Sequence, residues 1–158
     1  GLADAGYRAI ESLRLEKAYR AWGAEIGPDH NPLMAGLGFA VKLRSNTPFL
    51  GREALEAARA RPLPRLLAGF SVADPGVSLF GRETVFRDGV RVGWLASGGF
   101  GHTLGRPLGY GYVRDPEAGV TRETVLSGRY ELEVAGVRVP AEAFLEAPYD
   151  PKGARIRA

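Results

Sequence analysis

The chain has 158 residues, of which 45% are hydrophobic, and this is enough for one ordinary domain or two small ones with a real core. The net charge is +3 with both signs interspersed, so no basic run indicates a nucleic-acid or membrane surface. The absence of cysteine excludes disulfide frameworks, cysteine nucleophiles and thiolate metal sites.

The sequence also lacks the patterns of membrane and secreted proteins. No stretch approaches the roughly 20 apolar residues of a membrane span. The opening residues, GLADAGYRAI, lack the basic region and apolar core of a signal peptide. We therefore predict a soluble, cytoplasmic chain.

The first predicted element is a helix over residues 2–13, with Asp4 as its candidate N-cap. Up to Leu13 the apolar residues share one face of this helix. From Leu15 onward they share another face, rotated by about half a turn. A change of side indicates that a helix kinks or ends there.

Two interpretations of the charged residues at this break are open. Arg14, Glu16, Lys17 and Arg20 suit the solvated face of an amphipathic helix. Alternatively, the break turns Glu16 inward, among apolar and aromatic residues. A buried carboxylate then needs an ion pair or water, and Arg14 or Lys17 are the nearest candidate partners.

The next segments alternate turns with short elements. Residues 27–32 form a turn-rich connector, residues 37–43 (LGFAVKL) predict a buried strand, and residues 51–61 predict a short helix. Pro62 and Pro64 close that helix. We therefore predict two domains, residues 1–63 and residues 64–158.

After Pro64 the pattern changes to short strands. The Asp88-Gly89 pair predicts a hairpin between strands 83–86 and 90–96, and Pro140 predicts a strand end or a sheet edge. The remaining strands are predicted over 66–72, 108–113, 129–134 and 137–139. Together they predict an α+β protein whose second part is a small antiparallel barrel or sandwich.

Three separated blocks carry a resemblance to a known family. They are ESLRLEKAYRAWGAEIGPDHNPLMAGLGFAVKL at 11–43, FLGREAL at 49–55 and GWLASGGFGHTLGRPLGYGYV at 93–113. In this order they resemble the folate-binding aminomethyltransferase family, which includes the glycine cleavage aminomethyltransferase and the C-terminal halves of sarcosine and dimethylglycine dehydrogenases and oxidases. The SLRLEKAYR form is closer to the dehydrogenase and oxidase branch.

The resemblance implies the fold and a cofactor. Residues 1–63 would be the end of a mixed αβ folate-binding region, and residues 64–158 an antiparallel β-barrel domain. Tetrahydrofolate would be the cofactor and the small-molecule partner.

The resemblance also assigns three folate-binding residues. It places Glu16 against the pterin, where a carboxylate accepts two adjacent N–H donors in a fork. Phe39 would contact the flat rings, although an ordinary core role is equally open, and Arg44 would approach folate oxygens. Arg155 suits a solvated tail better than a ligand contact. His30 and His102 lack a carboxylate at ligand spacing, so we predict no metal site.

The family reaction transfers an iminium or aminomethyl carbon to N5 of tetrahydrofolate, assisted by an aspartate in the N-terminal half. None of Asp4, Asp29 or Asp74 matches that residue, so we assign no catalytic residue. We expect this chain to be the distal part of such an enzyme, with a separate N-terminal half or a flavin-containing domain or subunit as its partner.

Two other functions stay open at this point. The chain could be a non-catalytic folate-binding or interaction module that needs a separate N-terminal half. A related family in iron–sulfur cluster assembly shares the fold, but its cysteine-containing KGC segment has no counterpart here, where FLGREAL stands.

Overall fold

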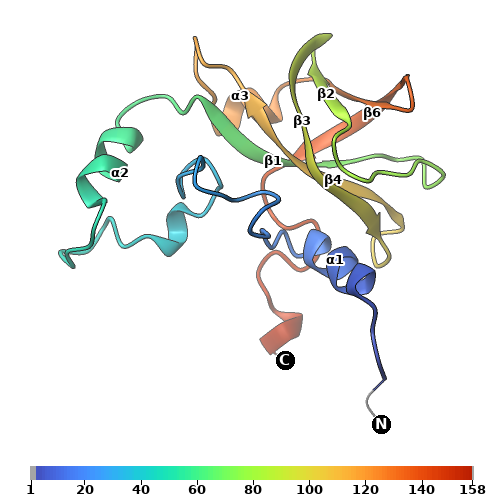
Figure 1. Cartoon of the computed structure of the whole chain (residues 1–158), viewed down its shortest axis with the longest axis horizontal. Helices are drawn as coiled ribbons and strands as arrows, with labels where there is room; N and C mark the ends of the chain where they lie inside the picture. The colour runs from blue at the N-terminus through green and yellow to red at the C-terminus, as the bar shows by residue number, and fades with distance from the viewer. Residues whose placement is uncertain (1–2, 158) are drawn as a thin grey trace.

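The strands after Pro64 close into a barrel. The structure, a computed structural model, describes residues 3–157. Six antiparallel strands form a closed barrel in the order β1-β4-β3-β2-β5-β6 (Figure 1). The strands are β1 (Arg65–Ser71), β2 (Thr84–Arg87), β3 (Val90–Gly101), β4 (Arg106–Arg114), β5 (Tyr130–Val134) and β6 (Val137–Phe144). The predicted α+β class and antiparallel barrel are confirmed.

The helices are short and lie outside the barrel wall (Figure 1). They are α1 (Tyr7–Glu16), α2 (Arg52–Arg59), α3 (Arg122–Leu126) and the 3-10 helices η1 (Gly38–Ala40) and η2 (Arg155–Arg157). Helix α2 confirms the helix predicted over 51–61 and stands away from the barrel (Figure 1). Among residues 3–157, none of the helices combines the length and the apolar character that crossing a membrane requires.

The hairpin between β2 and β3 forms at the predicted turn. Asp88 and Gly89 have φ values of 51° and 81°, and two successive positive φ values define the turn whose twist matches paired strands. Arg87 and Val90 are the partners that close the hairpin. The local sequence therefore sets the register of this pair.

Strand β6 is longer than predicted. It continues past Pro140 to Phe144, and Pro140 lies opposite Glu131 of β5. Pairing of β6 with β1 begins only at Glu142, so Pro140 sits where the strand has a single neighbour. A proline is tolerated at such a position because no second ladder needs its missing N–H. Pro140 therefore marks a local edge but does not end the strand.

The prediction of a buried strand over residues 37–43 was wrong. This segment forms η1, in which Ala40 N–H donates to Leu37 O at 3.0 Å, and the Phe39 side chain is 85% exposed. A strand needs a partner for its backbone groups, and the closed barrel leaves no free edge for a seventh strand. The apolar run therefore satisfies its backbone locally.

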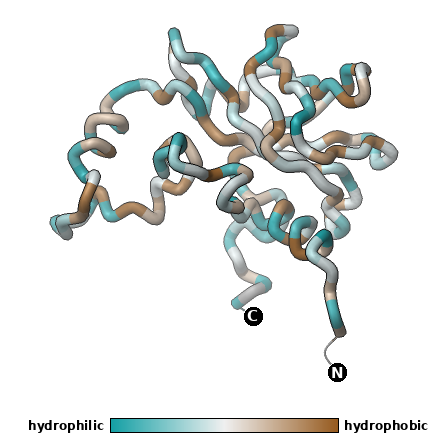
Figure 2. The backbone as a smooth tube through the Cα atoms, viewed as in Figure 1, coloured by the Kyte–Doolittle hydropathy of each residue, from teal (hydrophilic) through white to brown (hydrophobic). Residues whose placement is uncertain are grey.

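Helix α1 ends where the apolar pattern changes sides. It begins after Gly6, and not at Asp4 as predicted, and it ends at Glu16. Leu2, at the start of the predicted helix, lies outside the described residues. Figure 2 shows hydrophobic and hydrophilic residues alternating along α1 and the strands. The buried side chains near the end of α1 lead directly to the candidate site.

The core has two parts. The first fills the barrel, with Phe70, Leu95 and Leu132 fully buried. The second lies on the outer face of β1 and β4, where Leu15 of α1 packs with Tyr110. This second cluster attaches α1 and the following connector to the barrel. The division into residues 1–63 and 64–158 stays a prediction.

Candidate functional site

Glu16 is buried at the end of α1, beneath the turn that joins β3 to β4. Its side chain is 2% exposed. Oε1 accepts hydrogen bonds from the backbone N–H groups of Thr103 at 2.7 Å and Leu104 at 3.0 Å, and Oε2 accepts one from the Thr103 hydroxyl at 2.8 Å. The Glu16 carbonyl accepts from the Tyr149 N–H at 3.1 Å. Glu16 thus joins α1, the β3–β4 turn and the C-terminal segment.

The partners predicted for Glu16 are wrong. Lys17 donates instead to the Asp150 carbonyl at 2.7 Å and to its carboxylate at 3.1 Å. Arg14 pairs with Glu11 and Glu25. Amide and hydroxyl donors satisfy the buried Glu16 carboxylate, and a carboxylate bound by several such donors needs no cation beside it.

A second buried carboxylate, Glu25, lies in the connector between α1 and η1, residues 17–37. Arg14 donates to its Oε1 at 2.7 Å, Ala21 N–H donates to its Oε2 at 2.8 Å, and the Ser97 hydroxyl also donates to Oε1. The hydroxyl of Tyr112 donates to the Glu25 carbonyl at 2.8 Å. Glu25 therefore ties the connector to both α1 and the barrel.

Arg14 is charged within this network. Burial alone would lower the pKa of Arg14, but hydrogen bonds to Glu25 and Glu11 outweigh it, so that pKa is raised above its ordinary value. Sequence reasoning missed Glu25, because one glutamate in a turn-rich connector resembles a solvated residue. The one available signal was Arg14 at the helix break, since a buried arginine needs a carboxylate partner.

The structure separates the three predicted folate residues. Phe39 lines a groove of about 590 Å³ between the end of α1, η1 and the loop after β6, whereas neither Glu16 nor Arg44 lines it. Arg44 lies exposed in the turn after η1. Other residues along this groove are Lys17, Tyr19, Arg20, Ile26, Arg122 and Glu146. We call it the Phe39 groove.

The Phe39 groove has aromatic and cationic walls. Phe39 and Tyr19 are both largely exposed, so their ring faces are available to a flat molecule. Arg20 is held rigidly, because it donates to the carbonyls of Ala35 and Ala18. Burial lowers the pKa of Arg20 from its ordinary value, which still leaves the guanidinium charged at neutral pH. The groove can therefore accept a flat ring with anionic groups attached.

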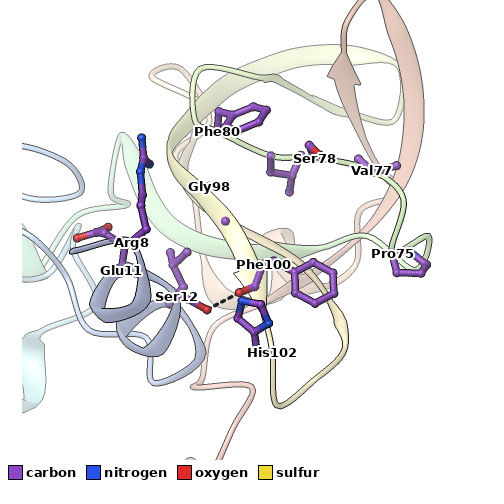
Figure 3. Close-up of a pocket in the computed structure, with 13 residues that line it drawn as sticks. Arg8, Glu11, Ser12, Pro75, Val77, Ser78, Phe80, Gly98, Phe100 and His102 are labelled. Carbon is purple, nitrogen blue, oxygen red and sulfur yellow. Dashed lines mark hydrogen bonds between the residues drawn. The ribbon is translucent and has the colours of Figure 1, made fainter. Parts of the chain in front are cut away.

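A second concave surface lies on the other side of α1. It encloses about 380 Å³ between α1, the β1–β2 loop and β3 (Figure 3). Arg8 and Glu11 of α1 line it together with Phe80 and Phe100, and Ser12 donates to the Phe100 carbonyl (Figure 3). None of the predicted site residues lines this surface.

Of the other residues singled out in the sequence, His102 lines the second surface, whereas Arg155 and His30 line neither. Arg155 is exposed and donates to the Tyr149 hydroxyl at 3.2 Å. His30 stacks on Tyr112 with ring centroids 4.3 Å apart. In the part of the chain that the structure describes, no three His, Asp or Glu residues gather as metal ligands would.

Two domain families match the chain. Residues 65–150 match the Glycine cleavage T-protein C-terminal barrel domain, and residues 1–45 match the GCVT N-terminal domain. The first match coincides with the closed barrel, and the second covers α1, the connector and η1. The two segments are the ones that Glu16 and Glu25 join.

Individual proteins show the same likeness. Human mitochondrial sarcosine dehydrogenase is 48% identical over 158 residues, covering 99% of this chain, and the chain spans 17% of that protein's length. The aminomethyltransferase of Desulforamulus reducens is 40% identical over 124 residues, covering 78% of this chain and 33% of the relative.

A solved structure shows the same fold. The crystal structure of glycine cleavage system aminomethyltransferase T from Bartonella henselae superposes with a TM-score of 0.73 at 26% identity, covering 89% of this chain and 37% of that one. The resemblance seen in the sequence is thereby confirmed. Since the barrel match alone spans more than half of the residues, this chain belongs to the glycine cleavage T-protein family.

Proposed function

We propose that this chain is the distal part of an enzyme that transfers a one-carbon unit, as an aminomethyl or iminium group, to tetrahydrofolate. The observation that carries the proposal is the likeness to sarcosine dehydrogenase, which runs through both the helical segment and the barrel at 48% identity. The likeness to an aminomethyltransferase and its solved relative supports the same chemistry. The substrate would be an N-methylated amine of the sarcosine or dimethylglycine type.

The Phe39 groove is the surface that best suits folate. Exposed aromatic rings favour stacking of the pterin or aminobenzoyl ring. Lys17 and Arg122, which pair with Asp150 and Glu146, would exchange these partners for the folate carboxylates. Arg44 is exposed beyond η1, and its contact with folate stays a prediction.

Glu16 would support folate binding in one of two ways. In the clamp role, it holds the β3–β4 turn and the end of α1, and so positions Lys17 at the groove. In the direct role, it grips the pterin, and then the carboxylate must give up Thr103 and Leu104. The three hydrogen bonds that it already accepts favour the clamp.

The proposed activity belongs to a larger assembly, because this chain spans 17% of the length of sarcosine dehydrogenase. The partner would be a separate N-terminal half, or a flavin-containing domain or subunit. Tyr7, Ile10 and Leu13 support this proposal: they form an exposed apolar stripe on the face of α1 that is turned away from the barrel. A cytoplasmic location stays a prediction.

The test combines binding with turnover. Calorimetry measures the binding of tetrahydrofolate to the chain, with Phe39→Ala as the site variant and Phe80→Ala, an exposed phenylalanine outside the Phe39 groove, as the control. The same protein is then mixed with tetrahydrofolate and formaldehyde or an aminomethyl donor, and methylenetetrahydrofolate is measured above the spontaneous background.

Each outcome separates the functions. Binding that is lost in Phe39→Ala, together with excess product, supports the enzyme. Binding without excess product favours a non-catalytic folate-binding module. Absence of binding, both alone and with an N-terminal half added, contradicts the proposal.

A further inference from the structure

Two arginines face each other at one end of the barrel. Arg65 begins β1 and Arg114 ends β4, and the two residues are direct partners in the register of these strands. Like charges directly opposite in an antiparallel pair are destabilising. Such a pair therefore needs a compensating negative charge.

The Arg114 side chain is held in place without being satisfied. Its guanidinium carbon lies 3.9 Å from the ring centroid of Trp94, so the group is stacked on the indole. Its Nε is buried and has no hydrogen-bond partner among residues 3–157. Trp94 itself is 42% exposed, so the stacked pair lies at the surface of the barrel.

A third arginine adds to the positive field. Burial, and then the charges of Arg65 and Arg91, lower the pKa of Arg114 from its ordinary value. The neighbouring carboxylate, Asp115, accepts hydrogen bonds from the N–H groups of Glu117 and Ala118. No ion pair joins Arg65, Arg91 or Arg114 to a carboxylate within the described part of the chain.

Arg138 provides a matched comparison inside the same barrel. Its guanidinium stacks on Phe86 at 3.7 Å, much as Arg114 stacks on Trp94. Unlike Arg114, it has a carboxylate at 3.8 Å, that of Glu131. Stacking on an aromatic ring thus does not explain why the Arg114 guanidinium lacks a carboxylate partner.

We propose that Arg65 and Arg114 form a binding site for an oxyanion, the phosphate or carboxylate group of a small molecule. We call it the arginine corner. Guanidinium groups bind such oxygens through paired N–H donors, and an anion there would neutralise the facing pair. Neither Arg65 nor Arg114 lines the Phe39 groove, so this site is separate from the proposed folate site.

Trp94 gives the binding experiment a direct signal. The chain has two tryptophans, so Trp22→Phe leaves Trp94 as the only one. Pyrophosphate and citrate are titrated into this protein, with NaCl at equal ionic strength as the reference. We expect a saturable change in fluorescence with at least one of the two anions and none with NaCl. Tighter pyrophosphate binding assigns the site to phosphates, and tighter citrate binding assigns it to carboxylates.

Variants locate the binding. Arg65→Gln should lower the affinity for the anion about tenfold or more, because a charge-assisted hydrogen bond is lost. Arg138→Gln should leave the affinity unchanged. Equal losses in both variants, or no saturable signal with either anion, would overturn the proposal.

Thermal melting of the unmodified chain provides a second readout that does not depend on Trp22→Phe. The bound anion should raise the melting temperature of the natural protein above its value in NaCl of equal ionic strength. Without the anion, Arg65→Gln should melt no lower than the natural protein, since it removes a like-charge contact. The rise in melting temperature that the anion causes should be absent in Arg65→Gln and retained in Arg138→Gln. An equal melting temperature of the natural protein in NaCl, pyrophosphate and citrate would contradict the site.

Discussion

Two buried glutamates hold the candidate site together by different physical means. Glu16 accepts hydrogen bonds from uncharged donors of the β3–β4 turn, whereas Glu25 accepts one from the cation Arg14. A carboxylate without partners would not stay ionised at such positions. Each glutamate therefore depends on partners that only the folded chain supplies.

Glu16→Gln tests the clamp. The amide keeps one acceptor oxygen but loses the charge, so we expect the free energy of unfolding to fall by roughly 1.5 to 3 kcal/mol, the range for hydrogen bonds to charged groups. Urea denaturation measures the loss, with the exposed Glu142→Gln as the control. Unchanged stability combined with weaker folate binding would instead support a direct grip on the pterin.

Arg14→Met tests the second glutamate. It leaves Glu25 buried without its cation, and breaking a buried ion pair costs roughly 3 to 5 kcal/mol of unfolding free energy. The double variant with Glu25→Met should cost less than the two single changes added together, because neither charge is then left alone. Additive losses in urea denaturation would show that the pair is not coupled.

At the scale of elements, turns were easier to predict than packing. Asp88-Gly89 and Ala135-Gly136 each have two positive φ values. The first hairpin forms at the predicted Asp88-Gly89 turn, and the second joins the strands predicted over 129–134 and 137–139. The failed strand over 37–43 was an apolar run, and an apolar run alone does not show whether a neighbouring strand exists. Local chemistry determines a turn, whereas a strand depends on distant partners.

Gly89→Ala tests the turn. The backbone at Gly89 has a φ of 81°, yet an added Cβ would meet nothing within 4 Å, so only backbone strain opposes the change. We expect a loss of about 1 to 2 kcal/mol in unfolding free energy. Gly27→Ala is the matched control, because its position is equally open and does not require a positive φ. A loss of equal size in both variants would rule out the backbone explanation.

At the scale of the whole molecule, the site was only partly predictable. The change of apolar face in α1 pointed to Glu16 as the place where the helix ends. Its donors Thr103 and Leu104 lie 87 and 88 residues further along the chain. Their positions follow from the register of β3 with β4. The apolar pattern of a single helix carries no information about that register. A separation of 72 residues likewise hid Ser97 as a partner of Glu25.

His30 makes the stability of the whole chain depend on pH. Burial, and next the positive charge of Arg65, lower the pKa of His30 below its ordinary value. The unfolded chain therefore binds a proton at a higher pH than the folded one, so acid favours unfolding. We expect the unfolding free energy to fall as pH decreases from 7.5 through the unfolded-state pKa of about 6.5 and toward 5.5.

Two variants check the source of this pH dependence. His30→Phe keeps a ring that can stack on Tyr112 and should flatten the profile. His102→Phe changes the only other histidine and should leave the slope as it was. An unchanged slope in His30→Phe, measured by urea denaturation at each pH, would contradict the assignment.

The bonds between the end of α1 and the C-terminal segment set an order of events during synthesis. Tyr149 donates to the Glu16 carbonyl, and Lys17 reaches Asp150, so α1 receives these contacts from residues made more than a hundred positions later. On the ribosome, the polar groups at this helix end stay in water until residues 149–150 have emerged. A nascent chain halted before Tyr149 would carry α1 packed on the barrel through Leu15 and Glu16, with the end of the helix still lacking its bonds to the C-terminal segment.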